Sequence, residues 1–532
     1  MPGSPQISSL WQPLRTPTFR NLLLADMVSD VGAFMQSTGA AWLMVSLNAG
    51  PMYVALTQTA AALPFFIFAL PAGAIGDIVD RRKLVLYTET WMVAVALALA
   101  ILTIGGFISP LPLLILTFAL SAGDAFETPT WRAILPELVK KQDLPAASAL
   151  NGIEFNFARA IGPGLAGLVI AAAGAGAAFV INTLSFIGVI VVVARWKRAI
   201  PKRTTPRESV TGATIAAIRY VRYSPAIRIL LTRSGLVMFF ASGLLALLPF
   251  LAHIVKNSPT AYGLLLGCFG LGAVAGALLM QQARARWSTE AVVTAGVGTF
   301  GIASMAAGAL RSLPALCVIM VVAGAAWIVF LSLFNVLILN QTPDWARARV
   351  LAIATLVFQG GVAAGSATWG AIATRFGVGA ALLYAGAGTL AMTSLALFLR
   401  LPDATVDLTS WNHWPLPATE NGALPTDDSF GPVLVTVEYQ VAAEKVAEFL
   451  KAVRQWGRIR RRDGARRWGI FRDMENTDRY VETFIVASWA EHLRQHERLT
   501  RADRETEELV QRYVVSEPKV RHLISAETAQ VT

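Results

Sequence analysis

The chain has 532 residues, of which 55% are hydrophobic and only 15% are charged, and its formal net charge is +11. Soluble domains are about 25% charged, so this composition is typical of a membrane protein and excludes an ordinary soluble enzyme. The only two cysteines, Cys268 and Cys317, lie within apolar stretches. We therefore expect no disulfide, no metal site and no redox cofactor.

Apolar stretches long enough to cross a bilayer, about 20 residues each, follow one another up to about residue 400. The sequence ahead of the first stretch has no short apolar core with a small-residue cleavage site, so no removable signal peptide is expected. We predict an all-α membrane protein with twelve transmembrane helices, near residues 21–46, 53–75, 84–107, 112–133, 146–172, 175–194, 225–252, 260–282, 290–310, 313–340, 349–374 and 378–399.

Ionisable residues occur at membrane depth in the first, fourth and fifth spans: Asp26, Asp30, Asp124, Glu127, Glu154 and Arg159. A charge there costs at least about 2.5 kcal/mol, so such a group usually faces a cavity or a partner. Asp26 and Asp30 are four residues apart and Asp124 and Glu127 are three apart, so each pair shares a helix face. We interpret these groups as a proton-coupling site or a substrate cavity. For Asp124 and Glu127, the alternative is that they bond nearby helix ends.

The fifth span contains a basic residue that needs a partner. Arg159 requires an acid if it faces a cavity, and Glu154 is the nearest acid along the chain. The neighbouring Phe155 and Phe157 either line a pocket for a large organic substrate or simply pack against other helices.

Basic residues gather in the even-numbered connections between spans, which contain Arg81, Arg82, Lys83, Lys140, Lys141, Arg284, Arg286, Arg347, Arg349 and the basic residues of 195–224. The odd-numbered connections contain only Lys256, Arg311 and Arg375. Short basic loops stay on the cytoplasmic side of a membrane. Both termini are therefore expected in the cytoplasm.

The longest connection, 195–224, divides the spans six and six, and an offset of 203 residues relates the two halves. The offset takes Gly73 to Gly276, Arg81 to Arg284, Lys83 to Arg286, Gly162 to Gly365 and Gly167 to Gly370. Two parallel six-span halves are a known plan of secondary transporters, with the substrate site between them. The same offset takes Asp30 to Arg233, and we hypothesise that these two meet across the cavity. The alternative is that Arg233 extends to the lipid headgroups.

The stretch "GAIGDIVDRRK" (73–83) resembles the loop after the second span of major facilitator superfamily transporters. The matching residues are Gly73, Asp77, Arg81 and Arg82, whereas Ile78 and Asp80 depart from the family pattern. "MQSTGAAWLMVSL", "RAILPELVKKQDLPAASALNG" and "NFARAIGPGLAG" resemble the transmembrane secretion effector branch, which includes the enterobactin exporters. The resemblance covers about residues 10–400. It implies a small-molecule transporter of the bacterial cytoplasmic (inner) membrane that works outward in exchange for protons.

This resemblance gives the turn a conformational role. Asp77 would accept hydrogen bonds from the start of a neighbouring helix, and Arg81 and Arg82 would hold acids on adjacent helices. Such a charge latch would stabilise the outward-facing conformation. The alternative is that Arg81, Arg82 and Lys83 only set the membrane topology.

Gly162, Pro163 and Gly167 in "GPGLAG" resemble the antiporter motif of the fifth span, although Ala166 replaces a glycine. Small residues let helices approach closely in lipid, and Pro163 removes a backbone donor and bends the helix. We expect tight helix packing here, and the export direction follows from the resemblance alone.

The chain is predicted to have five parts: an N-terminal half (1–194), a basic cytoplasmic linker (195–224), a C-terminal half (225–400), a flexible linker (401–431) and a soluble domain (432–532). In the last part, strands are predicted over 433–441, 465–474, 479–488 and 520–525, with helices over 443–461 and 489–511. The order βαββαβ predicts a small ferredoxin-like α+β domain in the cytoplasm.

The stretch "SWAEHLRQHER" is similar to the dimeric α+β barrel domains of antibiotic-biosynthesis monooxygenases. The resemblance implies a dimerising or regulatory module. A less favoured alternative is cofactor-free oxygenase activity in a cleft formed by Trp468, Trp489 and His492. His492 and His496 are four residues apart on a helix, but no third ligand is evident, so we predict no bound metal.

The leading hypothesis is a proton-coupled exporter of a siderophore or drug-like molecule, which works by alternating access. The alternative is a membrane-anchored enzyme or sensor that acts through the C-terminal domain. Expected partners are a small-molecule substrate, protons, the lipid bilayer and a second copy bound through that domain. Nucleic acid is disfavoured, because the basic run "RQWGRIRRRDGARRW" is better explained as a solvated face or a contact with anionic lipid.

Overall fold

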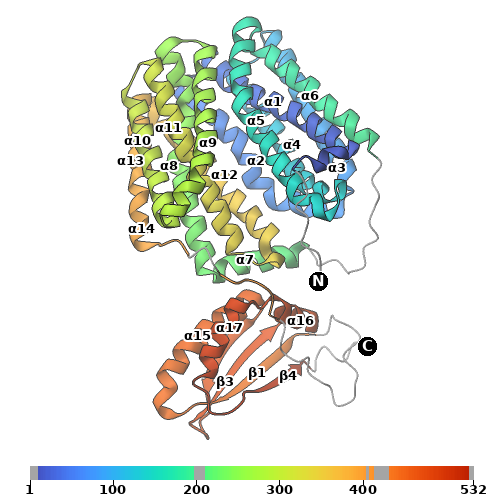
Figure 1. Ribbon diagram of the computed structural model, residues 1–532, viewed down its shortest axis with the longest axis vertical. Helices are drawn as coiled ribbons and strands as arrows, with labels where there is room; N and C mark the ends of the chain where they lie inside the picture. The colour runs from blue at the N-terminus through green and yellow to red at the C-terminus, as the bar shows by residue number, and fades with distance from the viewer. Residues whose placement is uncertain (1–9, 197–209, 403–405, 412–430, 526–532) are drawn as a thin grey trace. The chain divides into compact units, whose positions relative to one another are not determined.

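The computed structural model describes residues 10–196, 210–402, 406–411 and 431–525. They form two compact units. The first unit contains most of a helix bundle (Figure 1). The second contains the C-terminal domain, helix α7 and the adjoining ends of α8, α11 and α12.

The helices of the first 400 residues are α1 (Pro17–Ser46), α2 (Gly50–Ile78), α3 (Arg81–Ile104), α4 (Pro110–Leu138), α5 (Leu144–Ala173), α6 (Ala175–Arg195), α7 (Val210–Tyr223), α8 (Pro225–Lys256), α9 (Pro259–Arg286), α10 (Thr289–Ala309), α11 (Leu313–Asn340), α12 (Asp344–Phe376), α13 (Val378–Ala391) and α14 (Leu395–Phe398). Within the described ranges, 11 helices are long and apolar enough to cross a membrane, and they coincide with the second to twelfth predicted spans. The first predicted span forms α1, which is not among these 11. The count of twelve is thus not confirmed; α1 contains the polar residues Asp26, Asp30 and Gln36.

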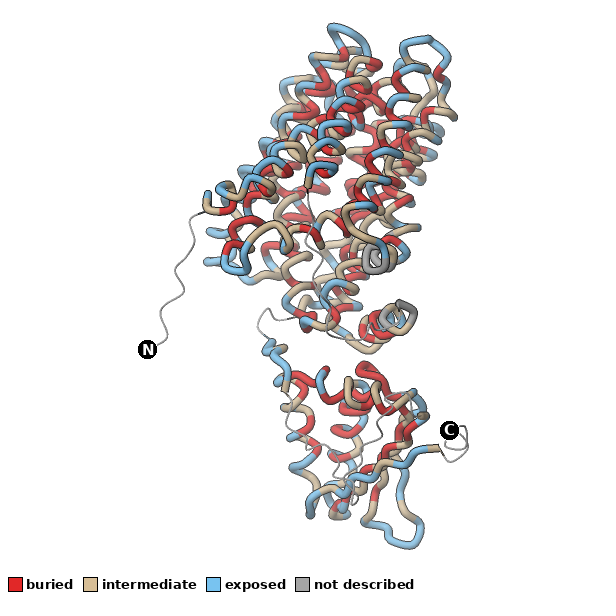
Figure 2. Tube along the Cα trace, turned by 90° about the vertical axis from the view of Figure 1, so that its right-hand side faces the viewer, coloured by how far each residue is buried: buried red, intermediate tan, exposed pale blue. Residues whose placement is uncertain are grey.

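The bundle contains two groups of helices, α1–α6 and α8–α14 (Figure 1). In the first group α1 packs on α5, α2 on α4, and α3 on α6. The second group repeats these pairs, because α8 packs on α12, α9 on α11, and α10 on α13. Buried and exposed stretches alternate along the helices of the bundle (Figure 2). The predicted duplication is therefore visible as a duplicated packing scheme.

Glycines at the repeat-related positions make equivalent contacts. A Cβ atom added to Gly162 of α5 would lie 2.6 Å from the Phe34 Cβ of α1. A Cβ atom added to Gly365 of α12 would lie 2.1 Å from the Phe239 carbonyl oxygen of α8. Both positions need glycine because the partner helix lies too close for a methyl group.

The connection predicted as a linker over 195–224 is partly helical. Residues 197–209 lie outside the described ranges, but α7 occupies Val210–Tyr223. The sequence prediction missed this helix because its basic residues were explained by topology alone.

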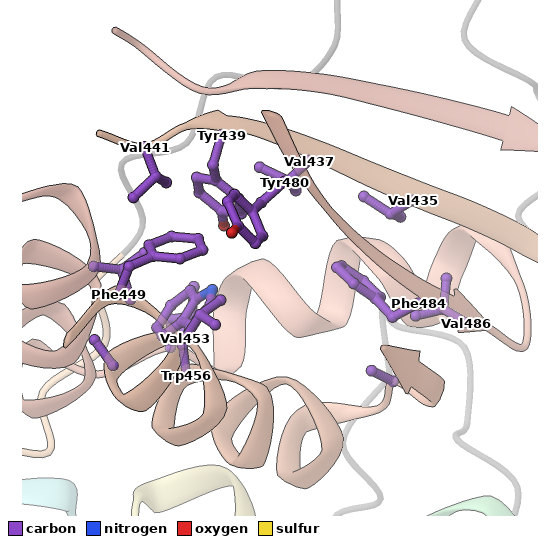
Figure 3. Close-up of a cluster of buried hydrophobic side chains, with 14 of the residues drawn as sticks. Val435, Val437, Tyr439, Val441, Phe449, Val453, Trp456, Tyr480, Phe484 and Val486 are labelled. Carbon is purple, nitrogen blue, oxygen red and sulfur yellow. The ribbon is translucent and has the colours of Figure 1, made fainter. Parts of the chain in front are cut away.

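The C-terminal domain has a four-stranded antiparallel sheet with the order β2-β3-β1-β4, formed by β1 (Val433–Gln440), β2 (Arg466–Arg472), β3 (Arg479–Val486) and β4 (Lys519–Ile524). Its helices are α15 (Val446–Asp463), α16 (Trp489–Arg498) and α17 (Arg501–Gln511). Alternate side chains of β1 and β3 are buried, and they pack against Phe449, Val453 and Trp456 of α15 (Figure 3). The four predicted strands are confirmed, and the ferredoxin-like class stays a prediction.

Two details of this domain differ from the sequence prediction. The single helix predicted over 489–511 is two helices, because Thr500 forms a capping box with Asp503 and begins α17. The predicted flexible linker is ordered in part, since Ser410 forms an antiparallel bridge with Thr500 and the Trp411 amide donates to the Leu499 carbonyl at 2.8 Å. Residues 403–405 and 412–430 of that linker lie outside the described ranges.

Candidate transport site

Six acids from four helices of the N-terminal half form one cluster: Asp26, Asp30, Glu89, Asp124, Glu127 and Glu154. Five of them were predicted from the sequence. Glu89 of α3 was missed, although it is only 2% exposed. An acid within a predicted span was the signal that marked the other five, and it applied equally to Glu89.

The polar contacts of this cluster leave several carboxylate oxygens without a partner. Thr88 donates to Glu127 Oε2 at 3.0 Å and Thr128 donates to Asp124 Oδ1 at 3.1 Å. Glu154 is 5% exposed, and neither of its carboxylate oxygens has a hydrogen-bond partner among the described residues. Asp30 lies close enough to Glu154 for the two carboxyl groups to interact electrostatically. The cluster therefore brings titratable groups together without neutralising them.

Asp124 is the exposed member of this cluster. It lies near the middle of the 29-residue α4, yet its side chain is exposed. A charged group at this depth needs water or a partner.

The basic residues predicted to serve this site do not pair with it. The structure shows no ion pair between Arg159 and Glu154, and the described part of the chain offers Arg159 no other acid within 4 Å. The predicted pairing of Arg233 with Asp30 is wrong. Arg233 Nη1 lies 2.7 Å from Glu290 Oε1 of α10 and donates to the Leu399 carbonyl at 2.9 Å.

The reason for the error is geometric. A sequence offset between repeats identifies equivalent positions of the two halves, and equivalent positions are not partners. Glu290 also accepts a hydrogen bond from the Leu401 amide at 2.7 Å. Arg233 and Glu290 thus fasten the end of the twelfth predicted span inside the C-terminal half.

The turn between α2 and α3 is held by its two arginines. Arg81 forms an ion pair with Glu137 of α4 at 2.8 Å and donates to the Ala133 carbonyl at 2.8 Å. Arg82 donates to the Val193 and Ala194 carbonyls at the end of α6, at 3.0 and 2.6 Å. The expectation that both hold acids is therefore correct for Arg81 only.

The remaining residues of this turn have separate roles. Asp80 caps α3, since its carboxylate accepts from the Lys83 amide at 3.1 Å. The Lys83 side chain is exposed. Gly73 and Asp77 belong to α2, and their side-chain surroundings lie outside the described part.

The close contacts between the two halves lie in the middle of the bundle and at the end opposite the Arg81 turn. We call the end of the bundle that carries the Arg81 turn the basic end. Away from it, a Cβ atom on Gly167 of α5 would lie 3.0 Å from the Pro259 carbonyl of α9, and one on Gly370 of α12 would lie 2.6 Å from Ala55 of α2. Thr59 Oγ1 also donates to the Ala363 carbonyl at 3.0 Å.

Nearer the basic end, α5 is exposed except on the face that carries Leu150, Glu154 and Ala158. Ile153 and Phe157, which share one helix face, are 55% and 48% exposed, and Phe155, on another face, is 44% exposed. Phe155 also meets Phe34 of α1 edge to face, with ring centroids 5.6 Å apart. These aromatic residues adjoin Glu154, so an apolar wall lies beside the acid cluster.

The predicted helix-bend motif lies in the joint between the halves. α5 continues through Pro163, whose carbonyl oxygen would lie 2.8 Å from a Cβ atom on Gly263 of α9. A shallow apolar groove of about 530 Å³ adjoins this contact, lined in part by Ile161, Leu165 and Leu264. None of the six acids lines it. The predicted close approach of small residues is confirmed.

The predicted cleft of the C-terminal domain is closed. Trp489, His492 and His496 are brought together, with His492 and His496 Nε2 atoms 3.2 Å apart, but the three side chains are at most 7% exposed. Burial and the neighbouring His496 and His522 lower the pKa of His492 to about 3. Trp468 has other contacts, since it donates to the buried Glu482 at 2.7 Å. No metal-binding group of three or more such ligands occurs among the described residues.

Comparisons with known proteins agree with this description. The sequence model of the family described as transmembrane secretion effector matches residues 8–530, which include the C-terminal domain. The chain is similar to the multidrug efflux pump Tap of Mycolicibacterium fortuitum, with 24% identity over 71% of this chain and 94% of that protein. It is also similar to the enterobactin exporter EntS of Citrobacter koseri, with 25% identity over 72% of this chain and 92% of that protein.

Solved transporters share the fold of the bundle. A bacterial homologue of the lysosomal transporter Spinster, in an inward-facing and unoccupied conformation, matches with a TM-score of 0.57 and 13% identity over 73% of this chain and 96% of that one. The nucleoside transporter NupG matches with a TM-score of 0.58 and 11% identity over 72% of this chain and 98% of that one.

Proposed function

We propose that this chain, which belongs to the transmembrane secretion effector family of major facilitator transporters, exports a small siderophore-like or drug-like molecule in exchange for protons. Family membership makes it a transporter and sets aside the alternative of a membrane-anchored enzyme. The relatives named as an efflux pump and an enterobactin exporter support the outward direction. In this proposal α1 also crosses the membrane, which brings the number of spans to twelve.

The observation that carries the proposal is the unneutralised acid cluster. A membrane anchor has no need of buried carboxylates, since each costs free energy at membrane depth. A transporter needs groups that take up and release protons between its two conformations. Asp30 and Glu154 are suited to this role because they face each other from α1 and α5 without a basic partner among the described residues.

The placement of the contacts between the halves supports alternating access. The halves touch away from the basic end, while α5 is exposed nearer to it. Basic loops favour the cytoplasmic side, so both termini are cytoplasmic in this proposal. The described conformation is then open inward, with the acid cluster reachable from the cytoplasm of a bacterial inner membrane.

The test is transport into inverted membrane vesicles with an acidic interior, over a panel of siderophores and fluorescent drugs. We expect gradient-driven uptake of at least one compound, and its loss in Asp30→Asn. Asp344→Asn is the matched control, because Asp344 is an exposed acid at the start of α12. Uptake that survives a protonophore, or an Asp30→Asn variant equal to wild type, would remove the proton-coupling role.

We also propose that the C-terminal domain, taken as ferredoxin-like, pairs with a second copy. β4 is an edge strand, and its Val520, Leu523 and Ile524 are 52%, 51% and 41% exposed. An apolar edge strand is prone to pairing with another chain. Leu523→Asp should halve the protein mass measured by light scattering in detergent, whereas Val515→Asp, an exposed apolar position outside the sheet, should not.

A further inference from the structure

Helix α7 is anchored to the turn between α11 and α12. Its Ala216, Ala217 and Tyr220 are buried. The Tyr220 hydroxyl donates to the Gln341 carbonyl at 2.9 Å, and its ring meets Trp345 edge to face with centroids 5.5 Å apart. One face of α7 therefore packs on the 341–345 segment.

The same helix holds the C-terminal domain through one arginine. Arg219 Nη2 lies 3.0 Å from Glu491 Oε1 of α16, and Arg219 Nε donates to the Arg462 carbonyl at 3.1 Å. The two side chains of the ion pair are only 15% and 14% exposed. Salt weakens such a mostly buried ion pair less than it weakens an exposed one.

Two arginines of the C-terminal domain contact aromatic rings of the α11–α12 turn and of α7. The Arg498 guanidinium lies over the Trp345 ring at 4.8 Å, and that of Arg462 lies over Tyr220 at 5.5 Å. Arg498 also donates to Glu491 Oε1 at 2.7 Å. Cation–π contacts of this type are favourable when desolvated, so α7, the turn and the domain form one connected set of contacts.

The contacting groups are held in place from within the domain. Arg462 is fixed by Asp463 and Asp503, each at 2.7 Å, which positions the carbonyl that Arg219 contacts. Burial raises the pKa of Glu491, but Arg498 and Arg219 outweigh it and leave the pKa below its usual value. The carboxylate thus stays ionised when docked.

We propose that the C-terminal domain is an intrinsic brake on transport: docked through Glu491 and Arg498, it holds α7 against the α11–α12 turn and must undock before these helix ends can move. The brake rests on the proposed transport function, whereas the docking itself does not. α8, α11 and α12 continue from these contacts into the helix bundle. The docked domain joins α7, which leads directly into α8, to the turn between α11 and α12, so movement of the α8 end against the α11 and α12 ends has to break these contacts.

The first test removes the Arg219–Glu491 ion pair, and with it the docking of the domain, in the full chain. Arg219→Ala and Glu491→Gln should speed amide hydrogen exchange in 210–223 and raise the initial transport rate about fivefold, the lower end of a typical coupling between sites. Arg222→Ala is the matched control, because Arg222 is an exposed arginine of the same helix. Faster exchange without faster transport would overturn the brake, and unchanged exchange would overturn the docking.

The second test holds the domain in its docked position with a covalent link. Arg219→Cys and Glu491→Cys, in a chain whose Cys268 and Cys317 are replaced by serine, would be joined by a bis-maleimide linker with a cleavable disulfide. Linking should stop transport, and cleavage should restore it. Transport that continues in the linked protein would overturn the brake. Inactivity of wild type and all variants over the whole panel would instead contradict the proposed function, while hydrogen exchange would still decide the docking.

Discussion

The two halves of the bundle share their packing but differ in their charges. The N-terminal half places six acids in its interior, whereas residues 225–400 contain only two acids, Glu290 and Asp344. Glu290 is paired with Arg233, and Asp344 is exposed beside Arg347. Gly162 and Gly365, by contrast, allow the same close approach of equivalent helices in both halves.

This difference indicates which features a duplicated bundle must keep. Close helix packing is kept in both halves, because the partner helices at Gly162 and Gly365 lie too close for a methyl group. In the proposed exchange with protons, titratable groups are needed in one half only, so the other half can have apolar residues or an internal ion pair in place of buried acids. We infer that the N-terminal half carries the coupling and the C-terminal half responds to it.

The largest effect is expected when a titratable group is removed from the N-terminal half, and this tests whether that half alone carries the coupling. Glu154→Gln should abolish gradient-driven transport, because the amide keeps the shape of the side chain but cannot carry a proton. Exchange of labelled for unlabelled substrate, which needs no net proton movement, should persist. Both are measured in inverted vesicles, with Asp344→Asn as the acid-to-amide control of the C-terminal half.

The ion pair of the C-terminal half should be structural. Arg233→Ala leaves Glu290 without its buried partner and should lower the free energy of unfolding by about 3–5 kcal/mol. Replacing both residues, Arg233→Met with Glu290→Leu, should recover most of this loss, since no uncompensated charge remains. Thermal unfolding in detergent checks both variants. A double variant as unstable as the single one would mean that the charges themselves are required.

The glycines that the halves share should differ in their tolerance of a methyl group. Gly365→Ala should cost about 1–3 kcal/mol, because the new methyl meets a backbone carbonyl at 2.1 Å. Gly162→Ala meets the Phe34 Cβ at 2.6 Å, a less severe approach than 2.1 Å, so its cost should be smaller. Equal costs, measured by the same unfolding assay, would contradict the assigned close approach.

Most of this asymmetry was predictable from the sequence, because an acid in an apolar stretch is visible without coordinates. Glu89 carries the same signal as an acid in the predicted third span, five residues from its start like Asp26 in the first span, so it was equally predictable. The partner of Arg233 was not predictable, because Glu290 is distant in sequence and in another helix. The two-helix form of 489–511 was predictable in principle, since Thr500 and Asp503 have the spacing of a capping box.

The smallest effect is expected in the turn between α2 and α3, where substitutions of Arg81 and Lys83 should differ. Arg81→Gln removes the ion pair with Glu137, which is 14% exposed, and should slow transport because the turn loses its link to α4. Lys83→Gln should change the unfolding free energy by less than about 0.5 kcal/mol and leave the transport rate unaltered, since its side chain is exposed. Initial rates in inverted vesicles compare the two variants directly. A Lys83→Gln variant as slow as Arg81→Gln would show that net positive charge, and not the Arg81 contact, is what the turn contributes.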